Sequence, residues 1–342
     1  MDKILIVGGA GFIGTNLAAF YAKKGQGVLI VDNLKREKTE HNLLWLKQNY
    51  PENIRFIKAD ICTENAVLRD LMEEVDVVFH LAAQVAVTTS IQDPVEDCRV
   101  NILGTLNVLE AIRQSKKKPV ILYSSTNKVY GDLHSLNVIE KPLRYVQTQY
   151  PFGIAEEQQL DFHSPYGCSK GAADQYVRDY ARIYGLKTIV FRQSCIYGCR
   201  QFGIEDQGWV AWFIIAAQTG KQVTIYGDGK QVRDLLFVDD LCAAYDAAVQ
   251  IPEKTSGKIY NIGGGPANTL SLLELIQILE KKLQKKIPVM FAAQRLGDQR
   301  IFIADIRNAF ADFNWKPRIG VQQGIEELFT WVQEQKELFT ER

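Results

Sequence analysis

The chain has 342 residues, enough for two domains, and its 46% hydrophobic and 23% charged residues are typical of a globular protein and exclude a disordered or fibrous chain. Forty basic and forty acidic side chains cancel to a formal net charge of zero, which argues against a nucleic-acid partner. The six cysteines form no CxxC pair and the four histidines no HExxH motif, so we expect neither a disulfide scaffold nor a metal.

Short apolar runs alternate with amphipathic ones along the first half of the chain. The expected strands are 4–7, 28–31, 54–57, 75–79, 119–123 and 187–191. The clearest expected helices are 12–23, 95–114 and 165–184. This alternation predicts an α/β fold, a Rossmann-type doubly wound parallel sheet that binds ligands beyond the carboxyl ends of its strands. We find no leader sequence and no apolar run long enough to span a membrane, so we expect a cytoplasmic protein.

A glycine-rich turn joins the first expected strand to the first expected helix. Gly8, Gly11 and Gly14 let the backbone approach a pyrophosphate, whose charge the helix N-terminus favours. Asp32 follows 18 positions after Gly14, at the end of the second strand. A carboxylate there accepts hydrogen bonds from ribose hydroxyls and repels a 2′-phosphate, so the pattern predicts NAD rather than NADP, a preference that the nearby Arg36 weakens.

A tyrosine and a lysine share one face of the helix expected after Ser164. Tyr166 and Lys170 lie four positions apart near its N-terminus. A lysine ammonium, the helix dipole and a bound nicotinamide cation would lower the tyrosine pKa, ordinarily about 10. The pair then suits proton abstraction from an alcohol as a hydride leaves the same carbon. Thr126, at the exit of the fifth strand, is expected to hydrogen-bond the same substrate oxygen. The alternatives are that the spacing of Tyr166 and Lys170 is due to chance and that Thr126 belongs to an ordinary Ser/Thr turn.

The second half of the chain is less regular. We expect an NAD-binding domain of residues 1–192 plus about 232–262, and a smaller α/β domain of residues 193–231 and 263–342 for the substrate. The segment 131–164 has no sustained periodicity, and a long loop of this kind predicts a cover for the site. Ser271 and Glu274 have capping-box spacing, which predicts a helix that continues to Lys286.

Together these motifs resemble the extended short-chain dehydrogenase/reductase family of nucleotide-sugar enzymes over nearly the whole chain. Three further features match this family: the segment His80-Leu-Ala-Ala-Gln, Asn101, and the stretch from Gly227 to Arg233-Asp234. It implies the NAD-binding residues Gly8, Gly11, Phe12, Ile13, Gly14, Asp32, Asn33, Arg36, Asp60, Ile61, Leu81, Ala82, Ala83, Gln84, Asn101, Ser124, Tyr166 and Lys170. It implies the catalytic residues Thr126, Tyr166 and Lys170. It implies the substrate-binding residues Thr126, Cys195, Arg233, Arg295 and Asp298.

Arginine suits phosphate because its planar fork donates two parallel hydrogen bonds. Cys195 stands where the family usually has an asparagine. For Arg295 and Asp298 a mutual surface ion pair is the alternative to nucleotide binding. Trp209 and Trp212 belong either to the wall of the pocket or to the core of their helix.

Four longer segments, 124–132, 159–175, 197–202 and 206–209, resemble those members of the family that invert C2 of a CDP-linked sugar. The resemblance implies a CDP-sugar substrate, transient oxidation to a 2-ketone and return of the hydride to the opposite face, so that NAD is not consumed. It also implies a homodimer or homotetramer, paired through two long helices.

Three other functions compete with this interpretation. Family 4,6-dehydratases carry Asp-Glu directly after the catalytic hydroxyl residue, and here Asn127 and Lys128 argue against dehydration. A UDP-sugar 4-epimerase uses the same Thr126, Tyr166 and Lys170 and stays open. A non-catalytic NAD-binding regulator is a different class, which the presence of both Tyr166 and Lys170 disfavours.

Overall fold

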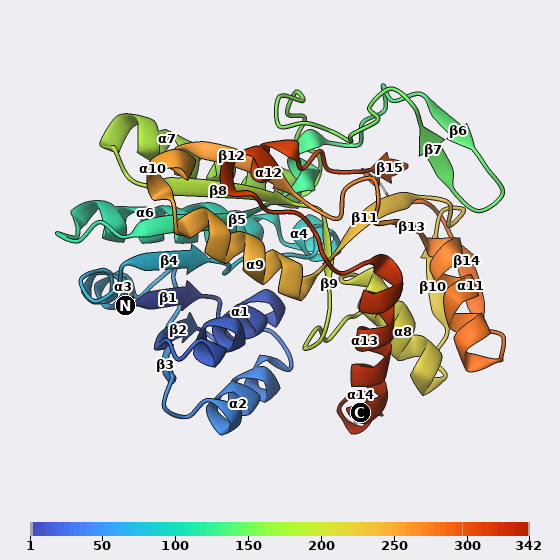
Figure 1. The fold of residues 1–342 in the computed structure, drawn as a ribbon, viewed down its shortest axis with the longest axis horizontal. Helices are drawn as coiled ribbons and strands as arrows, with labels where there is room; N and C mark the ends of the chain where they lie inside the picture. The colour runs from blue at the N-terminus through green and yellow to red at the C-terminus, as the bar shows by residue number, and fades with distance from the viewer. Residues whose placement is uncertain (1–2, 296, 341–342) are drawn as a thin grey trace.

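The computed structural model describes residues 3–295 and 297–340, and a seven-stranded parallel sheet forms the centre of its larger part (Figure 1). The strand order is β3-β2-β1-β4-β5-β8-β12. The strands are β1 (Ile4–Val7), β2 (Val28–Asp32), β3 (Ile54–Lys58), β4 (Val77–His80), β5 (Val120–Thr126), β8 (Thr188–Gln193) and β12 (Lys258–Ile262). Because the order reverses between β1 and β4, the carboxyl ends of these strands border a crevice. The prediction of a Rossmann-type parallel sheet is confirmed.

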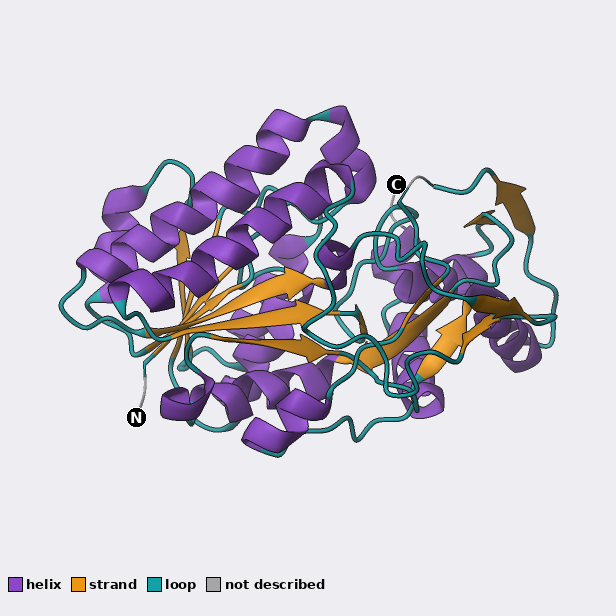
Figure 2. Ribbon diagram, turned by 90° about the horizontal axis from the view of Figure 1, so that it is seen from above, coloured by secondary structure: helices purple, strands orange, loops and turns teal. Residues whose placement is uncertain are grey.

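Helices cover both faces of this sheet (Figure 2). Ile4 and Ile6 of β1 belong to one buried cluster with α1 and α9, whereas Leu5 and Val7 belong to a second cluster with α3, α6 and α7. Two buried faces explain why the strands read as continuous apolar runs. The helices of this part are α1 (Phe12–Lys23), α2 (Thr39–Asn49), α3 (Asn65–Met72), α4 (Val87–Gln92), α5 (Pro94–Cys98), α6 (Gly104–Gln114), α7 (Ser164–Tyr184), α9 (Val238–Val249), α10 (Pro252–Thr255) and α12 (Arg307–Phe313).

Two expected helices differ from their predictions. The helix expected at 95–114 is divided into α5, a π-helical turn (Arg99–Leu103) and α6. The helix after Ser271 is capped as predicted, with both hydrogen bonds of the capping box, but it ends at Leu283. Its end precedes the expected Lys286 because Gln284 adopts a left-handed conformation with φ of 52°.

The smaller part of the molecule is built around short strands. The strands β13, β11 and β15 form one sheet, and β9 also pairs with β11; β10 pairs with β14. These strands are β9 (Cys195–Tyr197), β10 (Val223–Tyr226), β11 (Val232–Phe237), β13 (Thr269–Ser271), β14 (Val289–Ala292) and β15 (Ile301–Phe302). The helices here are α8 (Trp209–Thr219), α11 (Leu272–Leu283), α13 (Val321–Glu334) and α14 (Glu337–Thr340). One hydrophobic cluster contains buried residues of α1, α8, α9, α11 and α13, so a continuous core joins the two parts.

The segment 131–164 contains a hairpin of β6 (Val138–Glu140) and β7 (Tyr145–Gln147), which projects at the upper right of Figure 1. The hairpin is fastened to the smaller part. The Tyr145 amide donates to the Lys230 carbonyl (2.9 Å), and the Ser271 hydroxyl donates to the Leu143 carbonyl (2.7 Å). Across the described residues, no helix combines the length and apolar character that crossing a membrane requires.

Candidate active site

A cleft of about 440 Å³ opens at the carboxyl ends of β1, β2, β4 and β5 and reaches Arg233 in the smaller part. It therefore lies at the edge of the sheet that the fold predicts for ligand binding. None of its lining residues comes from 131–164. The hairpin of that segment packs on the smaller part, and the role of the segment as a cover stays a prediction.

The glycine-rich turn forms one end of the cleft. A Cβ atom on Gly8, whose φ is +84°, would lie 2.6 Å from the Ala82 nitrogen, and one on Gly14 would lie 2.4 Å from the Gly8 carbonyl oxygen. Only glycine permits this close packing of the turn against α1 and the loop after β4. The turn thus presents bare backbone at the N-terminus of α1, an arrangement that fits a pyrophosphate.

Asp32 stands at the end of β2, beside this turn. Its carboxylate accepts hydrogen bonds from the backbone amides of Ala10 (3.0 Å) and Leu34 (2.8 Å). Burial raises the pKa of Asp32, and these two hydrogen bonds oppose the rise. The side chain lines the cleft, so its free acceptor capacity faces the position expected for a ribose.

Most residues expected to bind the cofactor line the cleft. They are Gly8, Gly11, Phe12, Ile13, Gly14, Asp32, Asn33, Arg36, Asp60, Ile61, Leu81, Ala82, Ala83, Ser124, Tyr166 and Lys170. Gln84 and Asn101 do not line it. Asn101, on the π-helical turn, accepts from the Gln84 amide (2.9 Å), donates to the Gln84 carbonyl (3.1 Å) and donates to the Ser169 hydroxyl (3.0 Å). It therefore positions the loop after β4 against α7.

Thr126, Tyr166 and Lys170 meet in the middle of the cleft. Thr126 ends β5 and Tyr166 lies near the start of α7, and both side chains line the cleft. The Lys170 ammonium donates to the Ser124 carbonyl (2.6 Å) and lies 4.2 Å from the centre of the Tyr123 ring. The three side chains thus converge from one strand and one helix, as predicted.

The electrostatics of this group differ from the expectation. Burial raises the pKa of Tyr166 to about 12, and the hydrogen bond with Thr126 only partly opposes it. Burial also lowers the pKa of Lys170 to about 7, although Asp174 and Asp97 oppose the change. The expected lowering of the tyrosine pKa is therefore absent from the protein groups alone, because Lys170 is desolvated and directs its ammonium to a carbonyl.

Of the residues expected to hold the substrate, only Thr126, Cys195 and Arg233 line the cleft. Burial raises the pKa of the Cys195 thiol to about 12. Trp209 also lines the cleft, whereas Trp212 does not.

The side chains of Arg295 and Asp298 do not form an ion pair with each other. Asp298 accepts from Arg233 (2.7 Å), while Arg295 donates to Asp206 (2.6 Å) and stacks on the Tyr226 ring at 3.8 Å. They lie beside the cleft rather than in its lining, and Leu296 between them falls outside the described residues.

Two features of the cleft were missed by sequence reasoning. Lys128, considered only as the replacement for a dehydratase acid, lines the cleft and contacts Asp298 at 3.4 Å. The second is the segment 199–208, which we call the strap. Asn16 donates to the Cys199 carbonyl (2.9 Å), Asn42 donates to the Arg200 carbonyl (3.2 Å), and Arg36 donates to Gln207. No periodicity marks the strap, but its resemblance to family segments was a signal.

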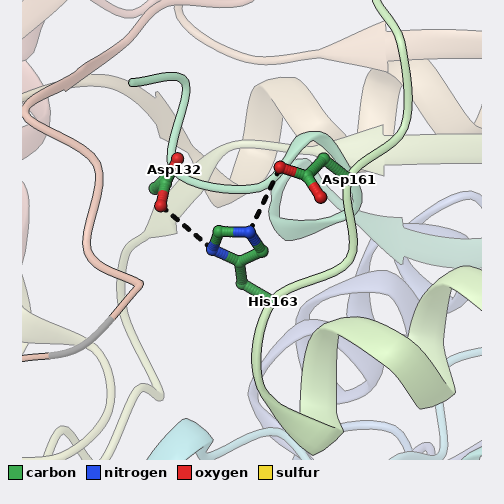
Figure 3. A group of neighbouring side chains, drawn as sticks. All are labelled: Asp132, Asp161 and His163. Atoms are coloured by element: carbon green, nitrogen blue, oxygen red, sulfur yellow. Dashed lines mark ion pairs between the residues drawn. The ribbon is translucent and has the colours of Figure 1, made fainter. Parts of the chain in front are cut away.

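A second polar cluster lies outside the cleft (Figure 3). Asp132, Asp161 and His163 place their ligand atoms within 4.8 Å of one another. The two ring nitrogens of His163 lie 3.0 Å from Asp132 and 3.1 Å from Asp161. His134 also pairs with Asp132, at 2.6 Å. Since both nitrogens of His163 already face carboxylates, the cluster is accounted for as a network of ion pairs.

Comparison with known proteins agrees with this geometry. Residues 4–263 match the model of the NAD dependent epimerase/dehydratase family. The chain is 46% identical to the CDP-paratose 2-epimerase of Salmonella typhi, over 96% of this chain and 99% of that protein. It resembles the structure of UDP-glucose 4-epimerase from Thermotoga maritima with UDP-glucose (TM-score 0.82, 31% identity, 98% and 99% of the chains). It also resembles UDP-glucuronic acid 4-epimerase from Bacillus cereus with UDP-glucuronic acid and NAD (TM-score 0.84, 27% identity, 97% and 99%).

Proposed function

This chain belongs to the NAD-dependent epimerase/dehydratase family, and from that premise we propose that it inverts C2 of a CDP-linked 3,6-dideoxyhexose, converting CDP-paratose to CDP-tyvelose. The observation that carries the proposal is the 46% identity to a CDP-paratose 2-epimerase over nearly the full length of both chains. Identity to the UDP-glucose 4-epimerase structure is 31%. Asn127 and Lys128, which replace the Asp-Glu of dehydratases, disfavour dehydration.

The residues present fit NAD. The cradle at Gly8 and Gly14, which a Cβ atom would fill, would accept the pyrophosphate, and Asp32 would accept hydrogen bonds from the ribose hydroxyls. When bound, NAD supplies the acceptor and later the donor of a hydride, together with a positive charge on its oxidised ring. We propose that the cofactor-lining residues given above, with Asn101 and Gln84 as support, hold it.

The chain's own groups then handle the proton. Tyr166 accepts the proton of the C2 hydroxyl while the hydride leaves C2, and Thr126 hydrogen-bonds the same oxygen as it becomes a ketone. Lys170 stabilises the phenolate, which burial alone disfavours, and the positive charge that bound NAD supplies would act in the same direction. After the sugar turns in the cleft, Tyr166 returns the proton and C2 receives the hydride on its other face. Atoms and electrons balance without net consumption of NAD.

The nucleotide end of the substrate has to be held in place while its sugar is free to turn. We propose that Arg233, Arg295 and Asp298 hold the nucleotide diphosphate and ribose, with Cys195 close by, and that the sugar remains free to turn between them and Tyr166. The large part of the molecule then serves NAD and the small part serves the nucleotide sugar.

Proton NMR in D₂O tests this function. The purified protein, with CDP-paratose or CDP-tyvelose and no added NAD, is expected to invert C2 with the C2 proton retained. Deuterium at C2 would show removal and return of a proton and would refute the hydride mechanism. Inversion of UDP-sugars at C4, with no reaction of the CDP-sugars, would establish the 4-epimerase instead. Binding of NAD without any nucleotide sugar would indicate a regulator.

We further propose a homodimer or homotetramer. Helix α7, helix α5 and the π-helical turn expose large apolar side chains. These are Val95, Leu103, Tyr176, Ile183 and Tyr184, with exposed fractions of 77%, 51%, 44%, 66% and 47%. An exposed apolar surface of this kind favours association. Sedimentation velocity that finds only monomer at micromolar concentration would contradict the proposal.

A further inference from the structure

Lys128 has no role in the proton chemistry, yet it lies beside it. It stands two positions after Thr126 on the 3-10 helix Asn127–Tyr130, and its backbone amide donates to the Thr126 hydroxyl oxygen (3.3 Å). Its side chain lines the cleft and is 24% exposed. A half-buried ammonium next to the reacting centre requires an anionic partner.

In this structure that partner is a carboxylate shared with a second cation. The same oxygen of Asp298, Oδ1, accepts from Arg233 at 2.7 Å and from Lys128 at 3.4 Å. Two cations thus share one oxygen of Asp298, and a second carboxylate, that of Asp132, acts on Lys128 more weakly. Burial lowers the pKa of Lys128, and Asp298 opposes the change. A further anion in the cleft would oppose it more strongly and keep the ammonium charged.

The position of the reacting carbon indicates which anion this is. In a nucleotide sugar, C2 is bonded directly to the anomeric carbon that carries the diphosphate, whereas C4 lies across the ring. When C2 is held against Tyr166 and Thr126, the sugar-linked phosphate must therefore lie near Thr126. A cation that binds this phosphate has to lie close to Thr126. Among the residues that line the cleft, Lys128 is then placed for the sugar-linked phosphate and Arg233 for the other phosphate.

We propose that Lys128 binds the sugar-linked phosphate of the substrate and, with Arg233 on the other phosphate, selects C2 as the reacting carbon. This assignment rests on the proposed C2 chemistry. The diphosphate replaces Asp298 as the partner of both cations, and the freed carboxylate becomes available to the ribose hydroxyls. Lys128 is then a specificity-determining residue that stays in contact with the substrate while the sugar turns.

The test compares two ligands that differ by the phosphate in question. Titration calorimetry of the NAD-loaded protein with CDP and CMP gives the contribution of the second phosphate. Lys128→Met is expected to weaken CDP binding about ten- to hundredfold, the range for a hydrogen bond to a charged group, and to leave CMP nearly unchanged. Lys128→Arg should retain most of the affinity for CDP. Lys316→Met, at an exposed lysine, is the matched control and should change neither.

Other results would overturn the assignment. An equal loss of affinity for CDP and CMP, or no loss, would show that Lys128 only forms a structural ion pair with Asp298. The nucleotide-free Lys128→Met protein would then have a lower melting temperature than the wild type. Lys128→Gln gives the same comparison if the methionine variant does not fold. If the wild type inverts CDP-paratose and only the CDP effect is missing, the proposed function stands and this assignment fails. If the wild type inverts a UDP-sugar at C4 instead, both the C2 chemistry and the phosphate-binding role of Lys128 are refuted.

Discussion

Asp174 of α7 and Arg192 of β8 form a doubly hydrogen-bonded ion pair, with oxygen–nitrogen distances of 2.9 and 3.0 Å, inside the core. Their side chains are 0% and 2% exposed. Asp174 also accepts from the Ser125 hydroxyl at 2.7 Å, directly before Thr126 in β5. The pair therefore connects the helix that carries Tyr166 and Lys170 with the two strands at whose ends the substrate is expected.

Breaking this pair should be costly. Arg192→Met leaves a buried carboxylate without its cation, and we expect a loss of about 3–5 kcal/mol in the free energy of unfolding. The double variant Asp174→Leu/Arg192→Met should lose less than Arg192→Met alone, because no charge then remains buried. Urea denaturation of the four proteins of this cycle measures the difference. Additive losses would show that the two side chains act independently.

Tyr166→Phe removes the proposed proton acceptor and little else. We expect kcat to fall by about 10²–10⁴-fold, the usual contribution of a general base, with the bound NAD content unchanged. Turnover is measured by NMR and the NAD content by the absorbance released on denaturation. A variant with near-normal turnover would exclude Tyr166 as the proton acceptor.

The protonation of Tyr166 should depend on the cofactor. Burial raises its pKa to about 12 in the protein alone, and the positive charge of oxidised NAD should lower this value more than NADH does. Below the apparent pKa the phenol keeps its proton and accepts none, so kcat/KM should rise with pH through that value. Phenolate absorbance, compared between wild type and Tyr166→Phe with each cofactor form, measures the pKa. Identical values with NAD and NADH would contradict the electrostatic argument.

Lys170 should lower the free energy of unfolding at those pH values where its side chain is protonated in both the folded and the unfolded chain. Its folded pKa of about 7 lies below the ordinary value of 10.5. The cost is therefore complete below pH 7 and fades as the pH rises from 7 to 10.5, where only the unfolded chain binds the proton. We expect Lys170→Met to be inactive yet more stable than the wild type below pH 7, with the difference shrinking as the pH increases. Melting temperatures of the cofactor-free proteins across this range check the trend.

Gly8→Ala and Gly25→Ala separate backbone strain from close packing. Both glycines have positive φ, +84° and +74°, but a Cβ atom on Gly25 meets nothing within 4 Å. Gly25→Ala should lose only about 1–2 kcal/mol from its left-handed conformation. Gly8→Ala should lose more stability and most of its bound NAD, because its Cβ atom would lie 2.6 Å from Ala82. Equal effects in the two variants would show that close packing at the turn is unimportant.

Sequence patterns predicted the sheet well because parallel strands buried on both faces are short and apolar throughout. They also placed Asp32, Thr126 and Tyr166, since each follows a strand or opens a helix that the pattern marks. The π-helical turn at Asn101 was missed because the apolar periodicity continues through it from α5 to α6. The hairpin within 131–164 was not predicted, because its partners, such as Lys230 and Ser271, are far away in sequence.

The electrostatics of the site were harder to predict than its members. A spacing of four positions brings Tyr166 and Lys170 to one helix face, but it does not reveal that Lys170 is deeply buried or that its ammonium faces the Ser124 carbonyl. The partners of Asp298 depend on how the two parts of the molecule meet. Such contacts join residues far apart in the chain, and short-range patterns carry no information about them.

The strap bears on how long the protein retains its cofactor. Its hydrogen bonds to Asn16, Asn42 and Arg36 tie it across α1, α2 and the rim of the cofactor cleft. An enzyme that borrows a hydride and returns it is inactivated whenever the reduced cofactor escapes before the sugar has turned. Gln201, Asp206 and Gln207 of the strap line the cleft, so we expect the strap to slow the escape of the cofactor. The working lifetime of each protein molecule then depends on how long it retains its own NAD.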